Sequence, residues 1–278
     1  MSFLFKSISS IYKFARLLSL DVALGGVVFC GSIAKFYNES LPFGIYTSLF
    51  FSIWLIYTFD HLMDARKAIH EPTMNRHQFH KRNQTSIVVG MVFGLMLGVF
   101  SLLFVPPITL LYGMIVLVIV FLYFILAWKM KIFMIKEVLI ASVYSTGVLL
   151  GPVSLIEIPT AHFVCLIFQI FGIALINLLV LSFYELENDQ KDGQHSWAVR
   201  FGKSVTEIHI KYCIYSLLML QALSFYWMKD QLLLQSILVG MTFILWVIFL
   251  RPHTFKEDER YRTFSDLIFF LPGIIFWS

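Results

Sequence analysis

Nine runs of mostly apolar residues, each long enough or nearly long enough to cross a lipid bilayer, dominate this sequence. A membrane-spanning helix needs about 20 such residues, because roughly 30 Å of hydrocarbon is crossed at a rise of about 1.5 Å per residue. The sequence therefore predicts an all-α, polytopic membrane protein with nine transmembrane helices. The runs cover residues 17–36, 42–60, 86–105, 107–128, 137–156, 161–183, 207–228, 231–250 and 263–278.

Charged side chains are too scarce for a protein surrounded by water. They make up 14% of the 278 residues, whereas hydrophobic residues make up 59%. A soluble domain carries about 25% charged residues. The same composition excludes a disordered chain and a nucleic-acid-binding protein, and three isolated cysteines exclude a disulfide-rich secreted fold. We expect residues 1–278 to form a single transmembrane domain.

The distribution of Lys and Arg predicts the orientation in the membrane. With the N-terminus inside, 19 of the 21 basic residues fall on the inner side, and only Lys35 and Lys229 fall on the outer side. This asymmetry follows the positive-inside rule and supports the count of nine spans. The prediction is an integral, multi-pass protein with a cytoplasmic N-terminus, in the plasma membrane or, in a bacterium, the inner membrane.

Two of the predicted inner loops are long, at about residues 61–85 and 184–206. Long structured loops are more often functional than short ones. Each follows a helix end at which two carboxylates stand four residues apart, so that each pair shares one helical face. The pairs are Asp60 with Asp64, and Glu185 with Asp189.

Carboxylates at these positions need a compensating cation. Like charges at this spacing repel by a few tenths of a kcal/mol, and the negative end of the helix dipole adds about 0.3–1 kcal/mol per group. Mg²⁺ suits such oxygen ligands, and it commonly binds phosphate oxygens at the same time. Basic residues near the pairs are expected to bind the phosphate charge; they are Arg66, Lys67, Arg76, Lys191, Arg200 and Lys203.

Simpler interpretations exist for each of these features. The carboxylates of one pair alone would usually just solvate a helix end, but two matched pairs favour a shared site. Glu137 is interpreted as a solvated border charge. Asp21 either reaches the border or pairs with Arg16, and Asn177 either faces a chamber or bonds to another helix.

A transition-metal site at His77 and His80 is disfavoured, because diiron hydroxylases need several His boxes and many more than the eight histidines present. The Asp-x2-Asp-Gly spacing of CDP-alcohol phosphotransferases is absent, because Ala65-Arg66 follows Asp64.

The two acidic loops resemble those of the UbiA superfamily of intramembrane prenyltransferases, which has nine helices and two cytoplasmic aspartate-rich motifs. Asp60 and Asp64 match its first motif, and Glu185 to Asp189 matches its second. The sequences around the pairs also match, and the resemblance implies a bundle around a central cavity. The matching segments are Thr73-Met74-Asn75-Arg76, Lys191, Gly193, Ser196 and Ala198-Val199-Arg200-Phe201-Gly202.

Several positions depart from the family pattern. Ile56 stands where the first motif has an asparagine, and Glu185 replaces an aspartate with a longer acidic side chain. In the second loop, Gln190, Gln194 and His195 stand where many members carry Arg or Lys. These changes reduce the positive charge expected to face a diphosphate.

The resemblance implies a Mg²⁺-dependent transfer of a prenyl group from a prenyl diphosphate to an aromatic or other lipophilic acceptor. Asp60, Asp64, Glu185 and Asp189 would bind the metal and the diphosphate, and an aromatic-lined chamber would shelter the allylic cation. Two alternatives remain open at this stage. One is a catalytically impaired, lipid-binding relative, and the other is a small-molecule membrane transporter. The expected partners are the two substrates and the bilayer, with no nucleic acid.

Overall fold

The computed structural model describes residues 12–67, 71–130 and 136–277; the side chains of residues 67, 120 and 122–130 lie outside this description. Within these ranges the chain is helical, without a strand, as the sequence predicts. The elements are α2 (Leu20–Phe36), α3 (Phe43–Lys67), α4 (Asn75–Arg82), α5 (Gln84–Ser101), η1 (Leu102–Phe104), α6 (Pro107–Met130), α7 (Lys136–Leu155), α8 (Thr160–Lys191), α9 (Trp197–Phe201), α10 (Lys203–Trp227), η3 (Lys229–Gln231), α11 (Leu232–Leu250), α12 (Pro252–Lys256), η4 (Glu257–Glu259), α13 (Arg260–Leu267) and η5 (Ile268–Trp277).

Prolines fix several helix starts, because a proline has no backbone N–H to donate and its φ angle suits the first turn. Pro42 immediately precedes α3, Pro107 opens α6, and Pro159 precedes α8. These are the breaks that the sequence predicts between consecutive apolar runs.

The described helices include six that are long and apolar enough to cross a membrane. The predicted count of nine is not confirmed. Run 17–36 becomes α2 with 17 residues, and run 263–278 is divided between α13 and η5. Run 107–128 lies within α6, a helix of 24 residues, of which Pro107–Ile119 is an apolar part with described side chains. The six spans are Phe43–Arg66, Gln84–Phe104, Lys136–Leu155, Thr160–Lys191, Lys203–Trp227 and Lys229–Leu250.

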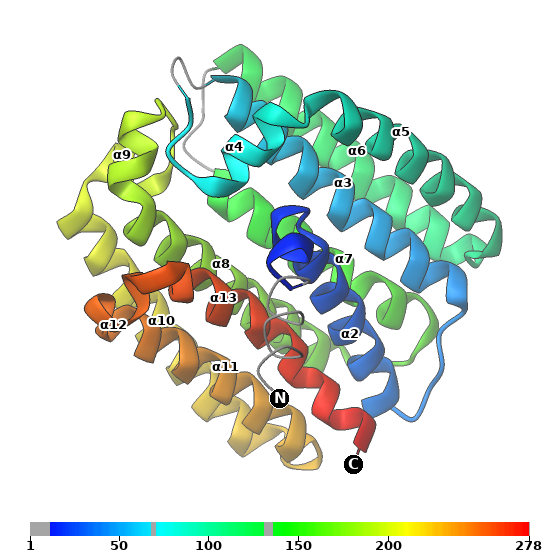
Figure 1. The fold of residues 1–278 in the computed structure, drawn as a ribbon. Coiled ribbons are helices and arrows are strands. Elements are labelled where there is room, and N and C mark those ends of the chain that lie inside the picture. Colours follow the sequence, from blue (N-terminus) through cyan, green and yellow to red (C-terminus); the bar gives the residue numbers. More distant parts are fainter. Residues whose placement is uncertain (1–11, 68–70, 131–135, 278) are drawn as a thin grey trace, which may run out of the picture.

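Helix α8 lies at the centre of the bundle. It packs against α7 and α10 and also contacts α11 and α13 (Figure 1). Its fully buried aliphatic side chains, among them Ile170, Ile173 and Ile176, join the main hydrophobic core. Helices α5 and α6 lie at the edge, where large apolar side chains such as Phe93 and Leu117 are more than half exposed. Apolar exposure on this scale suits a lipid environment.

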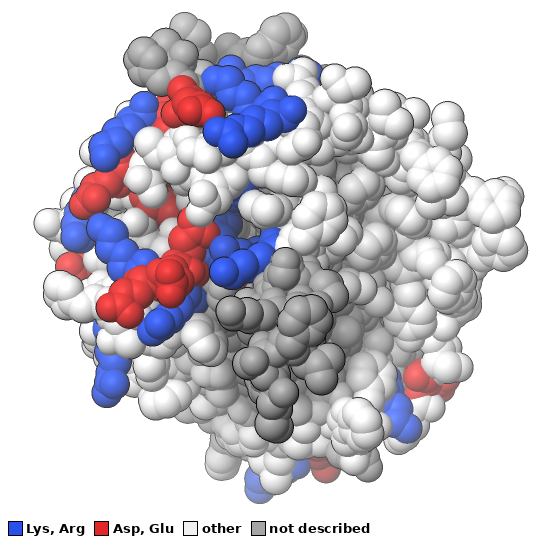
Figure 2. Space-filling view, viewed as in Figure 1, with Lys and Arg blue, Asp and Glu red and all other residues white. Residues whose placement is uncertain are grey.

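Charged side chains gather on one part of the molecule. In Figure 2 they cluster on the side where α4, α9 and α12 lie in Figure 1, and most of the remaining visible surface carries none. The inner loops of the sequence prediction contribute α4, α9 and α12. Charge is therefore concentrated at the end of the bundle where the two acidic helix ends lie.

Gly44, in the first turn of α3, allows a close approach to η1. A Cβ atom at this position would overlap the backbone carbonyl carbon and oxygen of Phe104, which cannot rotate away. We expect Gly44→Ala to lower the free energy of unfolding by about 1–3 kcal/mol through overpacking. Gly90→Ala is the matched control, because a Cβ atom added there would meet nothing within 4 Å, and it should be neutral or up to about 1 kcal/mol more stable. Thermal unfolding in detergent compares the two, and equal stabilities would contradict the prediction.

Candidate active site

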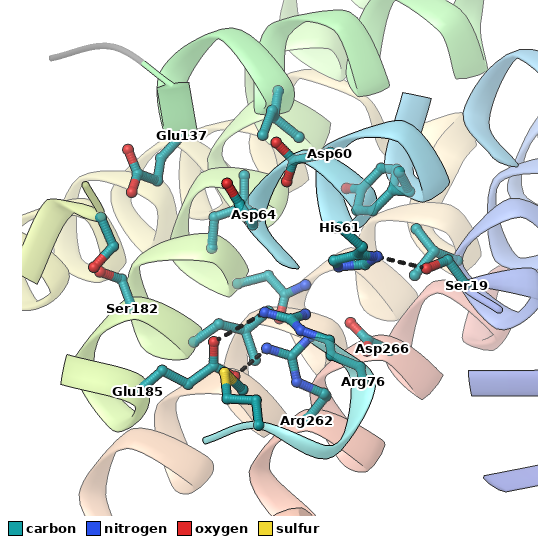
Figure 3. Close-up of a pocket in the computed structure, with 18 of the residues that line it drawn as sticks. Ser19, Asp60, His61, Asp64, Arg76, Glu137, Ser182, Glu185, Arg262 and Asp266 are labelled. Carbon is teal, nitrogen blue, oxygen red and sulfur yellow. Dashed lines mark hydrogen bonds and ion pairs between the residues drawn. The ribbon is translucent and has the colours of Figure 1, made fainter. Parts of the chain in front are cut away.

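One cavity at the charged end of the bundle brings the two acidic pairs together. Asp60 and Asp64 come from the last turns of α3, and Glu185 and Asp189 come from the last turns of α8. Figure 3 shows Asp60 and Asp64 on one side and Glu185 on the other. Parts of α2, α4, α7 and α13 complete the wall. Two helix ends far apart along the chain therefore face a single space, as their matched acidic pairs predicted.

The first pair shares one cation. The ammonium group of Lys136, at the start of α7, lies 2.7 Å from Oδ1 of Asp60 and 3.0 Å from Oδ2 of Asp64. The oxygens of both carboxylates therefore converge on a single positive charge. Because the two aspartates would otherwise repel each other at a helix end, Lys136 stabilises their placement.

The second pair is asymmetric. Glu185 is buried, and its Oε1 accepts hydrogen bonds from Arg262 and from the hydroxyl of Tyr261 at 3.2 Å. Its Oε2 is 3.3 Å from the guanidinium group of Arg76. Both carboxylate oxygens are thus engaged by protein donors, and two guanidinium groups meet at this acid (Figure 3). Asp189, one turn further along α8, is also buried and lines the cavity.

The second acidic loop is tied to the first by hydrogen bonds. The side-chain amide of Gln194 donates to the backbone carbonyl of Asp64 at 2.9 Å. The buried carboxylate of Asp192 accepts from the backbone N–H of Thr73 at 3.0 Å and from its hydroxyl at 3.2 Å. Gln194 therefore has a structural role at a position where the family pattern often has a basic residue.

Of the six basic residues predicted to face a diphosphate, Arg76 lines the cavity and four others do not. Arg200 and Lys203 lie over the rings of Phe201 and Phe183, with the charge 5.5 and 5.3 Å from the ring centres. Lys191 and Arg66 are exposed. The side chain of Lys67 lies outside the described residues.

Lys136 and Arg262 line the cavity, although the sequence analysis did not single them out for the site. Lys136 lies at the start of a helix, and Arg262 lies in a basic C-terminal stretch. Their positions in the sequence therefore did not indicate that they share a site. Glu137 differs from its predicted role as a solvated border charge. It is buried, and its carboxylate accepts the backbone N–H of Trp197 at 2.7 Å. This bond anchors the start of α9 to α7.

The departures from the family pattern fall into two groups. Ile56 is 40% exposed and does not line the cavity, and Gln190 is exposed. Gln194 and His195 both line the cavity. The changes at Ile56 and Gln190 therefore lie outside the cavity wall, whereas those at Gln194 and His195 alter the wall itself.

Two histidines of α4, His77 and His80, are buried beside the site. Burial lowers the pKa of His77 to about 2 and also lowers the pKa of His80; the positive charge of Arg76 acts in the same direction on both. The nearest carboxylate oxygen to His77 is Oδ2 of Asp192, 3.8 Å from its Nδ1. The folded chain therefore holds His77 neutral.

We expect the protein to lose stability in mild acid through His77. Below an ordinary histidine pKa of about 6.5 the unfolded chain binds a proton that the folded chain does not, so the stabilisation is complete above that pH and falls as pH decreases. Between pH 7 and pH 5 the loss through one such histidine is up to about 2 kcal/mol. His77→Gln should remove most of this component in thermal unfolding at the two pH values, whereas His253→Gln, at an exposed histidine, should not. Identical pH responses in both variants would contradict the prediction.

The comparison with known proteins identifies the family. The model of the UbiA prenyltransferase family matches residues 22–272. The chain belongs to this family. The match begins within α2, extends past α13 and includes both acidic motifs, so most of the cavity wall lies within the UbiA region.

A solved structure of a digeranylgeranylglyceryl phosphate synthase has the same UbiA fold. It superposes with a TM-score of 0.54 at 16% sequence identity, covering 96% of this chain and 98% of that chain. At this identity the likeness concerns the fold alone. No curated protein matched the sequence. Family membership and the apolar helices make this UbiA-family chain an integral membrane protein.

Proposed function

We propose that this UbiA-family chain is a Mg²⁺-dependent membrane prenyltransferase, which transfers a prenyl group from a prenyl diphosphate to a lipophilic acceptor. One observation carries the proposal most strongly. A pair of carboxylates that converge on one cation and a pair of guanidinium groups face the same cavity at the charged end of the bundle. Such a combination suits a metal-bound diphosphate.

The first acidic pair fits a magnesium ion better than the second does. Mg²⁺ is usually held by one or two carboxylates together with phosphate oxygens and water. Asp60 and Asp64 meet this requirement, because their oxygens already converge on the ammonium of Lys136. Among the described residues, no group of three or more His, Cys, Asp or Glu side chains is placed to hold a metal alone. We therefore propose Asp60 and Asp64 as the primary ligands. When bound, the ion would neutralise charge that builds on the leaving diphosphate.

Glu185 positions the two arginines. Its engagement by Arg76 and Arg262 leaves a dense positive charge at the cavity wall. Arginine binds phosphate oxygens through paired N–H donors, so these two residues are suited to hold the diphosphate as the allylic C–O bond breaks. Metal binding by Glu185 and Asp189 stays a prediction, as do diphosphate contacts of Arg66, Lys67, Lys191, Arg200 and Lys203.

The deeper wall is suited to the prenyl chain. Aliphatic side chains from α7 and α8, including Ile140 and Leu178, line it with the rings of Tyr57, Tyr144 and Phe269. Aromatic ring faces attract cations in water-poor surroundings. This wall can stabilise an allylic cation and exclude water, which would otherwise capture it. We further propose that the charged end of the bundle faces the cytoplasm, in keeping with the distribution of Lys and Arg.

The test is an incubation of the purified full-length chain, in lipid nanodiscs, with a panel of prenyl diphosphates and a membrane lipid extract. We expect prenylated lipid and released diphosphate with Mg²⁺, and neither product with EDTA; mass spectrometry detects both. Diphosphate binding without turnover would favour the impaired, lipid-binding relative. Uptake of a small molecule into proteoliposomes without chemical change would favour the transporter. Either result would overturn the proposed reaction.

A further inference from the structure

A second pair of carboxylates lines the same cavity, apart from the two acidic motifs. Asp21 comes from α2 and Asp266 from α13, and these two helices pack against each other. Both side chains are more than nine-tenths buried, at 4% and 6% exposed. Burying a carboxylate is costly unless it is paired and fully hydrogen-bonded. The reaction proposed above uses neither of them.

No cation forms an ion pair with either carboxylate among the described residues. Arg16, the partner that the sequence suggested for Asp21, instead bonds to Glu259 at 3.0 Å and to the hydroxyl of Thr263 at 2.7 Å. Arg262, one turn from Asp266 on α13, bonds to Glu185. Within the part of the chain that is described, neither Asp21 nor Asp266 has an ion-pair partner within 4.0 Å.

Polar atoms around the pair lack hydrogen-bond partners among the described residues. Oδ1 of Asp21 accepts the backbone N–H of Val22 at 3.0 Å, but its buried Oδ2 accepts nothing. The side chain of Asn177 lies beside the Asp266 carboxylate, and its buried Oδ1 accepts no hydrogen bond. The Tyr144 hydroxyl is also buried and without a partner. All of these side chains line the cavity.

These unmatched groups are mainly acceptors. Leaving a buried acceptor unsatisfied costs about 1–3 kcal/mol, and a ligand that donates O–H groups would remove that cost. The neighbouring wall is apolar, with Ala141, Ala174 and Phe269. A suitable ligand therefore joins a hydroxyl group to an apolar body, as a hydroxylated lipid does.

The pair is also close to the diphosphate end. Asp266 follows Arg262 by four residues of helix, which corresponds to about 6 Å along the axis. Asn177 precedes Glu185 by eight residues, which corresponds to about 12 Å. The first carbon of a prenyl chain is attached to the diphosphate, so it would lie between the arginines and this pair. A nucleophile must come within about 3–3.5 Å of that carbon.

We propose that Asp21 and Asp266 form the acceptor site of the proposed prenyltransferase and select a lipid whose nucleophile is a hydroxyl group. The C–O bond between the prenyl carbon and the diphosphate breaks, and its electron pair leaves with the diphosphate. The acceptor oxygen forms a new C–O bond to that carbon, and its proton passes to Oδ2 of Asp21. The products are a prenyl ether and diphosphate. This inference rests on the prenyl transfer proposed above.

The experiment uses 1-O-octadecylglycerol as acceptor and its di-O-methyl ether as the matched control lipid. Full-length wild type in nanodiscs should convert the first to a prenyl ether and leave the second unchanged. Asp21→Asn should lower the transfer rate by about 10²–10⁴-fold, the usual contribution of a general base, and Asp266→Asn should also lower it. Binding of a prenyl thiolodiphosphate should be unchanged in both variants, which also shows that they fold. Asp230→Asn, an exposed carboxylate at the other end of the bundle, should keep full activity.

The outcomes separate this inference from the proposed function. Transfer to a carbon atom of another acceptor, with no reaction of the hydroxylated lipid, would overturn the acceptor site and leave prenyl transfer intact. Undiminished ether formation in Asp21→Asn would do the same. If the wild type releases no diphosphate with any acceptor, both proposals are wrong. If Asp21→Asn does not bind the thiolodiphosphate, the acceptor site is tested by Asp266→Asn and by the reactions of the wild type with the two lipids.

Discussion

Replacing Arg262 with Gln is expected to lower the free energy of unfolding by about 3–5 kcal/mol, the usual result of removing one partner from a buried ion pair. Arg262 is 7% exposed and bonds to Glu185, which is 4% exposed. Without Arg262, the Glu185 carboxylate keeps Arg76 at 3.3 Å and the Tyr261 hydroxyl at 3.2 Å. One guanidinium group at this distance and a neutral hydroxyl only partly compensate a buried charge. Thermal or denaturant unfolding in detergent measures the change.

A second substitution tests the cause. Glu185→Gln in the Arg262→Gln background removes the uncompensated charge, so we expect it to restore part of the lost stability. Arg260→Gln is the matched control on the same helix, because its contacts to Glu257 and Asp258 are 3.5 and 3.9 Å long and solvent-exposed. It should cost no more than about 1 kcal/mol. Equal losses in Arg262→Gln and Arg260→Gln would show that the buried pair is not the source of the stability.

Replacing both Asp60 and Asp64 with Asn is expected to reduce prenyl transfer by at least about 10²–10³-fold, which corresponds to about 3–4 kcal/mol of transition-state stabilisation. The amides keep the shape of the side chains but lose the charge that draws a divalent ion. They also leave the ammonium of Lys136 without the carboxylates at 2.7 and 3.0 Å. The rate of diphosphate release as a function of Mg²⁺ concentration measures the effect.

Glu187→Gln is the matched control for this prediction. Glu187 belongs to the second acidic motif, but its side chain is exposed and lies 3.4 Å from Lys256 rather than in the cavity. Its loss should leave the rate and the Mg²⁺ dependence close to those of the wild type. Adding Lys136→Met to the double variant removes the unpaired ammonium and tests whether folding, rather than metal binding, caused the loss. Wild-type Mg²⁺ dependence in the Asp60 and Asp64 variant would rule out the first pair as ligands.

The sequence alone was sufficient for the fold class and for part of the site. Apolar runs predict membrane helices because each helix satisfies its own backbone hydrogen bonds within lipid. The matched spacing of the two acidic pairs placed Asp64 and Asp189 at one end of the bundle, and both line the cavity. Arg76 was the one basic candidate, among those whose side chains are described, that the structure places in the wall.

The partners of these carboxylates depended on the tertiary structure. Neither Lys136 nor Arg262 belongs to a local sequence pattern. Arg262 pairs with Glu185, 77 positions away, and such a pair depends on which helix faces pack together. Asp21 lies in an apolar helix and Asp266 in a polar one, and nothing in the sequence relates them until α2 and α13 meet. Hydropathy and the spacing of charges predict which side chains each helix buries or exposes. Only the packing of the helices decides which charged side chains face each other across the cavity. It therefore also decides which of these side chains the protein pairs and which a ligand can bind.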